Sequence, residues 1–436
     1  MGLVTGACLA EQGTEVICVD IDERKIQAIL AGTPPIYEPQ LEELLRRNIG
    51  SRLTATTDLR EAVLESDITF IAVGTPFDGH EIDLSAVRQT TREIGAALRA
   101  KRGYHAVVVK STVVPGTTSN VVLPLLEEVS GKRAGVDFSV GVNPEFLTEG
   151  QAVEEFMLPD RIVLGGDERV QDLMGDLYAT FPALVPRVRT STTTAEAIKY
   201  ASNALLATAI SFANEMANLC SALDDADVVD VMHGVHLSRY LSPPGPEGVP
   251  VRAPLASFLE AGCGFGGSCL PKDVRALVAH AARLGQRMPI LEAVLETNDG
   301  RAEAILTLAR LHVPDLSDAR VTILGLAFKP DTDDVRESPA IPIVQRLVDE
   351  GARVTIHDPV VPELPAALSE RPDAIVLTSS LEESVRGADV VILVTRWEHY
   401  RGIPALLADL ARKPVFIDGR RMLDKLEFAR YAGVGA

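Results

Sequence analysis

Two stretches of alternating strand-like and helix-like patterns, separated by one long Ala-rich segment, constrain the fold of this chain more than any other feature. Five short runs rich in β-branched residues lie in the first stretch: Glu15–Asp20, Ile68–Val73, Ala106–Lys110, Phe138–Val142 and Ile162–Leu164. Helical patterns lie between them, as at Asp22–Leu30 and Leu84–Ala100. Strands that alternate with helices form βαβ units, so we expect a mostly parallel sheet.

The Ala-rich segment runs from Thr192 to about Leu223 and contains neither Gly nor Pro. It is apolar on most faces, which predicts one long buried helix, either in a core or at a subunit interface. A loop rich in Pro and Gly follows at Leu241–Pro254. The strand pattern then returns in five runs: Val321–Leu324, Val354–His357, Ala374–Leu377, Val390–Val394 and Val415–Ile417.

These patterns predict an α/β chain with two doubly wound, Rossmann-like domains joined by a long central helix. We expect the first domain to span residues 1–190, a helical central domain to span 191–300 and the second α/β domain to span 301–436. A chain of 436 residues, 46% of them hydrophobic, is long enough to fill the cores of three such domains.

Composition argues against several classes of function. The net charge of −19 disfavours general binding to nucleic acid or anionic membranes, so an anionic ligand would need a local basic pocket. No apolar run is long enough for a membrane span, and no signal peptide is visible. The five cysteines are scattered without metal-ligand spacing: Cys8, Cys18, Cys220, Cys263 and Cys269. We therefore expect a cytoplasmic protein with no metal site.

The run Gly264–Asp273 (GFGGSCLPKD) carries the strongest chemical signal. Pro271 suits the first turn of a helix, which places Ser268 or Cys269 near the N-cap, at the positive end of the helix dipole. Lys272 adds positive charge, and both effects favour thiolate over thiol. The three glycines would let a ligand approach the backbone closely. We therefore predict a reactive cysteine, with a small buried Cys beside a turn as the ordinary alternative.

The first strand run indicates a nucleotide site. Asp20 ends this run, where an acid in dinucleotide-binding folds accepts hydrogen bonds from the adenosine ribose and disfavours a 2′-phosphate. This predicts NAD rather than NADP. Gly2 resembles the last glycine of a G-x-G-x-x-G turn, but no first strand and no first two glycines precede it. We therefore expect an incomplete NAD site, with weak NAD binding and lowered stability.

Other polar residues follow the strand runs, at the edge where open α/β sheets bind ligands. Thr75 follows the second run and Thr112 follows the third. The fourth run leads into Asn143–Gly150 (NPEFLTEG), where a helix would place Glu145 and Glu149 on one face.

Lys199 and Asn203 have the same four-residue spacing inside the Ala-rich segment. A lysine inside a largely apolar helix is costly unless it is paired or functional. A lysine that extends its charge to solvent along the helix surface is the alternative.

Together these motifs resemble the UDP-glucose/GDP-mannose dehydrogenase family of nucleotide-sugar dehydrogenases, and most closely its UDP-glucose-oxidising members. The matching segments occur in the family's order over nearly the whole chain: LVTGACLAEQGTEVICVDID, AVGTP, KSTVVPGTT, NPEFLTEG, PDRIVLG, EAIKYASNALLATAISFANEMANL, GFGGSCLPKD and GLAFKPDTDDVRESPA. The resemblance implies an NAD-binding first domain, a central dimerisation domain and a UDP-sugar-binding last domain.

The resemblance also implies the reaction, an NAD-dependent two-step oxidation of the C6 alcohol of UDP-glucose to UDP-glucuronate by a homodimer. Cys269 matches the nucleophile that holds the aldehyde as a thiohemiacetal and then as a thioester. Lys199 and Asn203 match the pair that stabilises oxyanions near the reacting carbon. Three further residues match groups that handle protons, position water or assist thioester hydrolysis: Asp273, Thr112 and Glu145.

Ligand contacts are implied in the same way. The cofactor contacts are Gly2, Asp20, Lys25, Thr75, Thr112, Glu149, Lys272 and Arg336. The contacts to the sugar nucleotide are Glu145, Phe146, Leu147, Thr148, Glu149, Lys199, Asn203, Arg252, Phe258, Leu259, Glu260, Ala261, Gly262, Gly266 and Lys329. Lys329 supplies positive charge that an acidic protein needs in order to bind a diphosphate.

The sequence departs from the family pattern in three places. The family's arginine from the neighbouring subunit falls in a region that is longer here, with Arg252 as the candidate and Arg239 as the rival. The frequent acid before Trp397 is replaced by Arg396, and a frequent Asn is replaced by Arg421. Both replacements bear on the identity of the nucleotide base or the sugar.

Two alternatives stay open. Within the family, GDP-mannose 6-dehydrogenases carry a similar cysteine motif, whereas UDP-N-acetylhexosamine dehydrogenases usually depart from NPEFL and from this loop. In a different class, an incomplete NAD site would make the chain a catalytically impaired sugar-nucleotide-binding paralogue. The retained catalytic residues argue against long-standing loss of catalysis, so we expect instead that the true start lies upstream of Met1.

Overall fold

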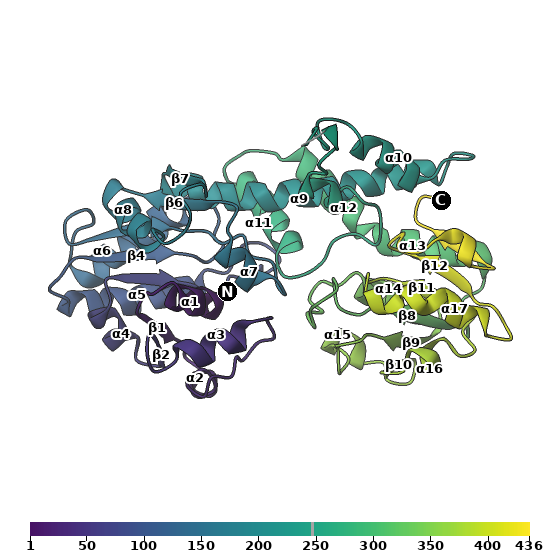
Figure 1. Cartoon of the computed structure of the whole chain (residues 1–436), viewed down its shortest axis with the longest axis horizontal. Coiled ribbons are helices and arrows are strands. Elements are labelled where there is room, and N and C mark those ends of the chain that lie inside the picture. Colours follow the sequence, from purple (N-terminus) through teal and green to yellow (C-terminus); the bar gives the residue numbers. More distant parts are fainter. Residues whose placement is uncertain (246–247) are drawn as a thin grey trace. The chain divides into compact units, whose positions relative to one another are not determined.

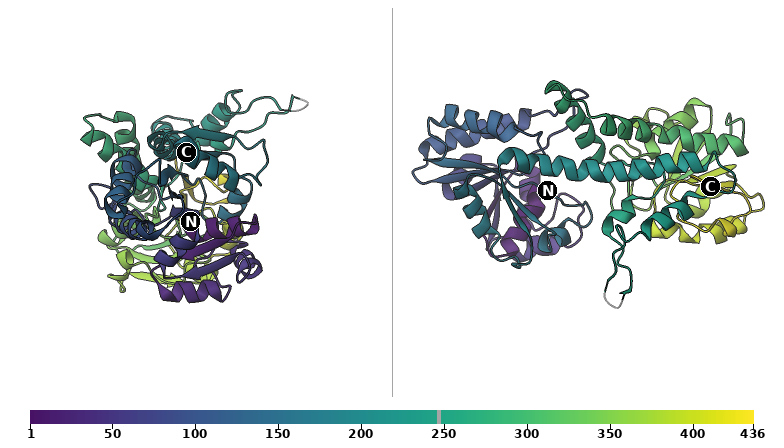
Figure 2. Two further views of the ribbon diagram at one scale, coloured as in Figure 1. Left: turned by 90° about the vertical axis from the view of Figure 1, so that its left-hand side faces the viewer. Right: turned by 90° about the horizontal axis from the view of Figure 1, so that it is seen from above.

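The computed structural model describes residues 1–245 and 248–436, so Pro246 and Glu247 of the predicted loop Leu241–Pro254 lie outside the described residues. The chain forms two compact units, Met1–Ser202 and Asn203–Ala436 (Figure 1). Helix α9 (Thr192–Cys220) begins in the first unit, ends in the second and is unbroken (Figure 2). The division into three domains at residues 190 and 300 stays a prediction.

The first unit contains two sheets. In the smaller one, β1 (Val16–Val19) pairs in parallel with β2 (Leu53–Thr56). The larger has the order β3-β4-β5-β6-β7, with bounds Ile68–Ile71, His105–Val109, Phe138–Val142, Ile162–Gly166 and Arg187–Thr190. Among the described residues, β5 and β6 pair antiparallel and the other neighbours pair in parallel. The predicted mostly parallel sheet is confirmed.

Strand β4 shows why the central strand runs are continuously apolar. All of its residues are buried. Ala106 and Val108 pack in one hydrophobic core, whereas Val107 and Val109 pack in a second one. Successive side chains of a strand point to opposite faces, so a sheet covered on both faces needs apolar residues at every position.

Helices cover the sheets of the first unit (Figure 1). Their bounds are α1 Gly2–Glu11, α2 Glu23–Leu30, α3 Leu41–Asn48, α4 Leu59–Glu65, α5 Ser85–Ala100, α6 Leu123–Ser130, α7 Ala152–Met157 and α8 Glu168–Leu177. Two glycines let α1 pack closely. A Cβ atom at Gly2 would lie 3.2 Å from Ala72 Cβ, and one at Gly6 would lie 2.9 Å from Cys18 Sγ. The N-terminus of α1 therefore lies beside the carboxyl end of β3.

The second unit is built on one parallel sheet with the strand order β10-β9-β8-β11-β12-β13. The bounds of β8 to β13 are Arg320–Leu324, Arg353–His357, Ile375–Thr378, Val390–Leu393, Val415–Asp418 and Tyr431–Gly433. This order, in which the chain winds outward from β8 in both directions, is that of a doubly wound domain. The second predicted Rossmann-like domain is confirmed.

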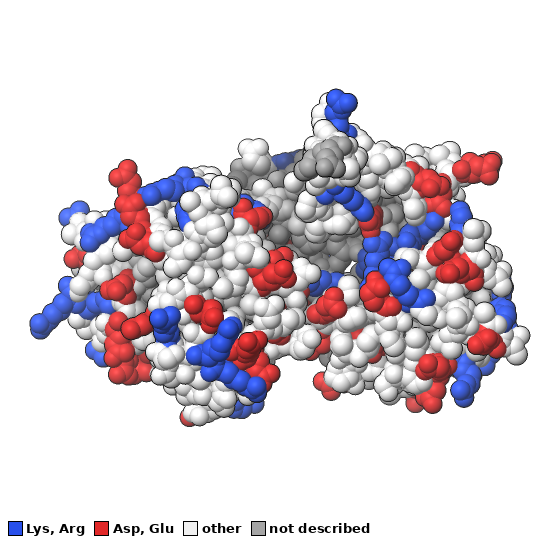
Figure 3. Space-filling model, viewed as in Figure 1, with Lys and Arg blue, Asp and Glu red and all other residues white. Residues whose placement is uncertain are grey.

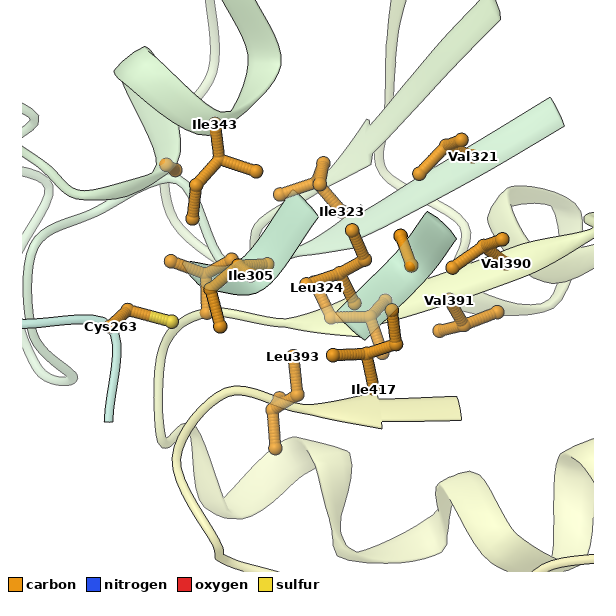
Figure 4. Close-up of a cluster of buried hydrophobic side chains, with 14 of the residues drawn as sticks. Cys263, Ile305, Val321, Ile323, Leu324, Ile343, Val390, Val391, Leu393 and Ile417 are labelled. Carbon is orange, nitrogen blue, oxygen red and sulfur yellow. The ribbon is translucent and has the colours of Figure 1, made fainter. Parts of the chain in front are cut away.

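The helices of this unit are α10 Val228–His236, α11 Leu270–Arg283, α12 Pro289–Asp299, α13 Arg301–His312, α14 Ala340–Asp349, α15 Ala366–Ser369, α16 Leu381–Val385 and α17 Ile403–Ala408. Its core brings α13 and α14 onto the sheet (Figure 4). Ile305 and Ile343 from these helices lie against strand side chains such as Ile323 and Leu393. Cys263, just before the predicted reactive loop, belongs to the same core.

Helix α9 differs from its prediction in where it ends and in how much of it is buried. It ends at Cys220 and is not fully buried, because Leu205, Phe212 and Leu219 are 58%, 45% and 52% exposed. These residues recur every seven positions, so they form one apolar stripe along the helix. Along this stripe the helix is not part of a core within the chain, and the alternative of a subunit interface stays a prediction.

Charges of both signs are interspersed on the face of the molecule in Figure 3. None of the five cysteines, all of which lie among the described residues, forms a disulfide. Among the helices of the described part of the chain, none has both the length and the apolar character needed to cross a membrane.

Candidate active site

The reactive-cysteine loop of the second unit ends at the N-terminus of α11. Cys269 is the N-cap residue, Pro271 lies in the first turn, and the Cys269 side chain is exposed and forms no disulfide. The Ser268 hydroxyl lies 3.6 Å from Cys269 Sγ. The predicted position at the helix N-terminus is confirmed, and the helix dipole there favours a thiolate.

The glycines of this loop make room for the protein itself. A Cβ atom at Gly266 would lie 2.2 Å from the carbonyl oxygen of Glu337. Gly267 has a φ of +80°, and a Cβ atom there would lie 2.7 Å from the Phe328 ring. The sequence suggested that these glycines let a ligand approach the backbone closely. Where their Cβ atoms would lie, neighbouring segments of the chain make that approach instead.

Three residues that sequence reasoning missed hold the loop in place. Asn298 Oδ1 accepts from the Phe265 N–H at 2.8 Å, and its Nδ2 donates to the Phe265 carbonyl at 3.1 Å. The buried Arg301 donates from Nε to the Gly262 carbonyl at 3.0 Å. Arg420 donates to the Gly264 carbonyl at 3.0 Å. An Asn and two Arg side chains at helix or strand ends carry no distinctive spacing, so no sequence signal marked them.

Asp273 is the centre of a polar network beside Cys269. Its side chain is 1% exposed, and its two carboxylate oxygens accept from Asn203 Nδ2 and Lys272 Nζ, each at 2.6 Å. Its backbone N–H donates to the Cys269 carbonyl at 2.9 Å. Three predicted catalytic residues, Cys269, Asn203 and Asp273, are therefore brought together in the second unit. The Lys272 ammonium, predicted to act on the thiol or the cofactor, is paired with Asp273.

Lys199 and Glu145 form the corresponding pair in the first unit. Lys199 Nζ lies 3.5 Å from Glu145 Oε1, and the two side chains are only 6% and 10% exposed. The Phe146 ring centre lies 5.5 Å from the same ammonium group. The alternative of a lysine extended to solvent is excluded by this burial, so Lys199 is a paired charge inside the protein.

The segment Asn143–Gly150 is not helical, which corrects the expectation that Glu145 and Glu149 share one helix face. Between the end of β5 and the start of α7 its backbone N–H groups bond to carboxylates. Glu145 Oε2 accepts from the Leu147 N–H at 2.8 Å. The buried Glu38, which sequence reasoning missed, accepts from the N–H groups of Gly150 and Ala152 at 2.9 and 2.8 Å. Pro144 also disfavours helical backbone at the residue before it.

Lys110 is a further buried charge near this pair. It follows β4, is 5% exposed and donates to Asn143 Oδ1 at 3.0 Å. Burial lowers the pKa of Lys110 to about 8, with Glu145 opposing and Lys199 reinforcing the shift. A lysine directly after a fully apolar strand run was the sequence signal that could have identified it. A cavity of about 200 Å³ lies here, with a lining that includes Lys110, Asn143, Glu145, Phe146, Arg161 and Tyr178.

Two features of the first unit suit a dinucleotide, namely an acid at the end of β1 and the N-terminus of α1. Asp20 follows β1, and its carboxylate accepts from the Asp22 N–H at 2.9 Å and pairs with Lys25 Nζ at 3.2 Å. The Thr75 hydroxyl donates to the Thr112 carbonyl at 2.7 Å, which joins the segments after β3 and β4. The N-terminus of α1 beside β3 is a site that suits a pyrophosphate. An acid for the ribose and a helix N-terminus for the phosphates are thus both present.

The remaining predicted contacts lie in both units. Glu149 adjoins Gly150 in the first unit, whereas Arg336 and Lys329 follow β8 in the second. Arg336 pairs with Asp334 at 2.7 Å, and Lys329 Nζ lies 5.9 Å from the Phe328 ring centre. The segment Phe258–Gly262 leads directly into the cysteine loop.

Arg252, the candidate for reaching a neighbouring subunit, is bonded within its own unit. Its guanidinium donates to Glu260 Oε1 at 2.9 Å. Arg396 pairs with the other oxygen of the same carboxylate. Burial raises the pKa of Glu260, but the two guanidinium groups outweigh it and hold that pKa below its usual value. The rival Arg239 is exposed.

The two replacements in the family pattern, Arg396 and Arg421, therefore have partners of opposite charge. Arg396 pairs with Glu260, and Arg421 pairs with Asp227 at 2.7 Å. A cavity of about 580 Å³ is lined by residues of these pairs, among them His236, Arg252, Glu260, Arg396 and Arg421.

Comparison with known proteins places three family descriptions along the chain. The models of the UDP-glucose/GDP-mannose dehydrogenase family match as the NAD binding domain at residues 1–182, the central domain at 193–300 and the UDP binding domain at 322–425. These matches account for most of the chain.

Individual relatives span nearly the whole length. The UDP-glucose 6-dehydrogenase AglM of Haloferax volcanii is 40% identical over 99% of this chain and 97% of its own. The GDP-mannose 6-dehydrogenase of Pseudomonas aeruginosa is 38% identical over 98% of this chain and 94% of its own. The solved structure of a UDP-glucose dehydrogenase from Pyrobaculum islandicum has a TM-score of 0.89 at 38% identity, and covers 100% of this chain and 95% of that one.

Proposed function

The chain belongs to the UDP-glucose/GDP-mannose dehydrogenase family and carries its NAD-binding domain, and on that basis we propose that it oxidises UDP-glucose to UDP-glucuronate. The observation that carries the proposal is the exposed Cys269 thiol at a helix N-terminus, one helical turn from the buried Asp273–Asn203 pair. An alcohol dehydrogenase that stops at the aldehyde needs no such thiol. An enzyme that proceeds to the acid uses one to retain the aldehyde and to present it for a second oxidation.

Bound NAD supplies the chemistry of hydride acceptance, once in each of the two oxidations. In the first oxidation the C6 alcohol loses a hydride and a proton and becomes an aldehyde. Cys269 Sγ then adds to the aldehyde carbon, the thiol proton passes to the carbonyl oxygen, and a thiohemiacetal results. Loss of a second hydride and proton gives a thioester. Water cleaves the C–S bond, which restores the thiol and releases the carboxylic acid.

Each remaining residue of the proposed site has a role that its surroundings support. Asn203 and Lys199 lie one turn apart on α9 and stabilise the oxyanions. Asp273, buried and held by two donors, passes protons through water, and Thr112 positions that water. Glu145, paired with Lys199, assists thioester hydrolysis. NAD is held by the first domain, residues 1–190, and the sugar nucleotide mainly by the last, residues 301–436.

We further propose a homodimer in the cytoplasm. The apolar stripe of Leu205, Phe212 and Leu219 on α9 supports self-association, since a soluble surface rarely leaves such a stripe uncovered. Cysteines that form no disulfide support a reducing compartment.

The assay that tests the substrate follows NADH absorbance with UDP-glucose and with GDP-mannose. UDP-glucose should yield two NADH per molecule consumed, because both oxidations use NAD. GDP-mannose is the alternative substrate, supported by the 38% identity to a GDP-mannose 6-dehydrogenase. Signal with GDP-mannose and none with UDP-glucose would overturn the proposed substrate. Binding without turnover of either would indicate a sugar-nucleotide-binding protein.

A further inference from the structure

Lys110 is a buried cation that the proposed reaction does not use. Its ammonium group donates to the side-chain and main-chain oxygens of Asn143 at 3.0 and 3.4 Å. The ring centres of Phe70 and Phe156 lie 5.9 and 6.0 Å from it. A charge in such surroundings is expensive, so its presence calls for partners or for a role.

Asn143 links Lys110 to Glu145 through a hydrogen bond and the backbone. Its Oδ1 also accepts from the Tyr178 hydroxyl at 2.6 Å, and its Nδ2 donates to the Val163 carbonyl at 2.9 Å. The Asn143 side chain is thus fixed by three groups, and Glu145 follows it by two residues. Because the intervening residue is Pro144, whose φ is restricted, a fixed Asn143 limits where the Glu145 carboxylate can lie.

Lys110, Glu145 and Lys199 also interact electrostatically. Glu145 is paired with Lys199, and the charge of Lys110 acts on both of them. The positive charge of Lys110 thus acts on a carboxylate that is already paired with Lys199. The other ionisable groups around the cavity are Glu155, Asp160, Arg161 and Tyr178. Asp160 pairs with Arg161, and Glu155 accepts from the Thr148 hydroxyl at 2.9 Å.

We propose that Lys110 is a positioning residue, whose ammonium group orients the Glu145 carboxylate for thioester hydrolysis through its hydrogen bonds to Asn143 and through its charge. This inference rests on the proposed role of Glu145. Since the pKa of Lys110 is about 8, its proton leaves within the pH range in which a dehydrogenase can be assayed. Loss of that proton removes the positive charge of Lys110 that acts on Glu145, and hydrolysis slows.

The test compares wild type with Lys110→Met and Lys110→Gln. We expect Lys110→Met to lower kcat at pH 7 about tenfold, the value of one charge-assisted hydrogen bond. KM for the sugar nucleotide should fall in parallel and kcat/KM should change little, because the slowed step follows formation of the thioester. Wild-type kcat should fall as the pH rises through about 8, and both variants should lack this fall. Mass spectrometry during turnover should find more thioester on Cys269 in the variants, because hydrolysis has become the slow step.

Lys101→Met is the matched control. The Lys101 ammonium is also partly buried and donates to the carbonyls of Val63 and Leu64 at 2.8 and 3.0 Å, in a different part of the unit. Its loss should reduce stability and leave the pH profile and the thioester level as in wild type. A Lys110→Met enzyme with a wild-type kcat and an unchanged alkaline fall would overturn the proposal.

Two further results would distinguish the role of Lys110 from a folding defect and from a wrong choice of substrate. If Lys110→Met does not fold, Lys110→Gln retains a donor to Asn143 without the charge, and a wild-type profile with no fall near pH 8 would itself contradict the proposal. If UDP-glucose is not oxidised, the proposed substrate fails. The same series is then run with the sugar nucleotide that is oxidised, and a normal pH profile in the variants would count against Lys110 alone.

Discussion

Asn203 and Asp273 are 70 positions apart in the sequence and are joined by a hydrogen bond of 2.6 Å from Nδ2 to the carboxylate. Asp273 is fully enclosed, and Lys272 occupies its other oxygen. The residue proposed to stabilise an oxyanion thus orients the residue proposed to move protons. The Cys269 backbone is bonded to the same Asp273, so the thiol, the amide and the carboxylate form one connected unit.

Replacement of Asp273 by Asn should lower kcat by about two orders of magnitude, the usual contribution of a positioned acid or base. The amide is nearly isosteric, but it neither pairs with Lys272 nor exchanges protons. Sugar-nucleotide binding measured by calorimetry should change little. Retention of wild-type kcat would exclude Asp273 from proton handling.

Replacement of Cys269 by Ser should abolish formation of the acid, because a serine hydroxyl cannot form the thioester intermediate. Product analysis by mass spectrometry should find no UDP-glucuronate, whereas UDP-glucose binding should be close to that of wild type. Cys220→Ala, at the end of α9 and far along the chain from the loop, is the control and should still form the acid. Acid formation by Cys269→Ser would refute the covalent mechanism.

Replacement of Gly267 by Ala should destabilise the second unit by at least about 2 kcal/mol, since it combines a left-handed backbone with an overlap on the Phe328 ring. Gly285→Ala is a matched control: Gly285 also has a positive φ, of +72°, and no atom lies within 4 Å of its Cβ position. Urea denaturation of both variants measures the free energy of unfolding, and the difference between them separates the cost of the ring overlap from that of the left-handed backbone. Equal losses would mean that the ring contact contributes nothing.

Lys110 should also leave a signature in the pH dependence of stability. Its pKa falls from 10.5 to about 8 on folding, so between these values the unfolded chain binds more protons than the folded one. The buried Lys110 charge therefore lowers the free energy of unfolding fully below about pH 8, and this cost disappears as the pH rises to 10.5. The free energy of unfolding of wild type should rise relative to that of Lys110→Met across this window. Parallel curves for the two proteins would contradict the shift.

Replacement of Phe212 by Glu should convert the proposed dimer to monomer, because it places a charge in the middle of the apolar stripe on α9. Light scattering after gel filtration measures the mass directly. Leu184→Glu changes a residue that is 93% exposed in the first unit and should leave the mass unaltered. A dimer that survives Phe212→Glu would show that the stripe is not the interface.

Much of the fold could be predicted because its strands are buried on both faces. Runs such as that of β4 are mostly apolar, and the structure places each predicted strand within two residues of its expected bounds. The strands β2 (LTAT), β7 (RVRT) and β13 (YAG) were missed because their polar or small residues form no apolar run. Their pairing comes from neighbouring strands rather than from their own composition.

The sequence by itself determined the doubly wound architecture, the long helix and the cysteine at a helix N-terminus, since strand burial, helix length and Pro271 are local properties. Only the tertiary structure decided what the charges do. The Asn143–Gly150 segment is not helical, because the Glu38 and Glu145 carboxylates accept hydrogen bonds from backbone N–H groups in and directly after it. The tertiary structure also brought Lys110 beside Glu145 and Lys199. The protonation of a buried group depends on neighbours that are distant in the sequence, and no local pattern carries that information.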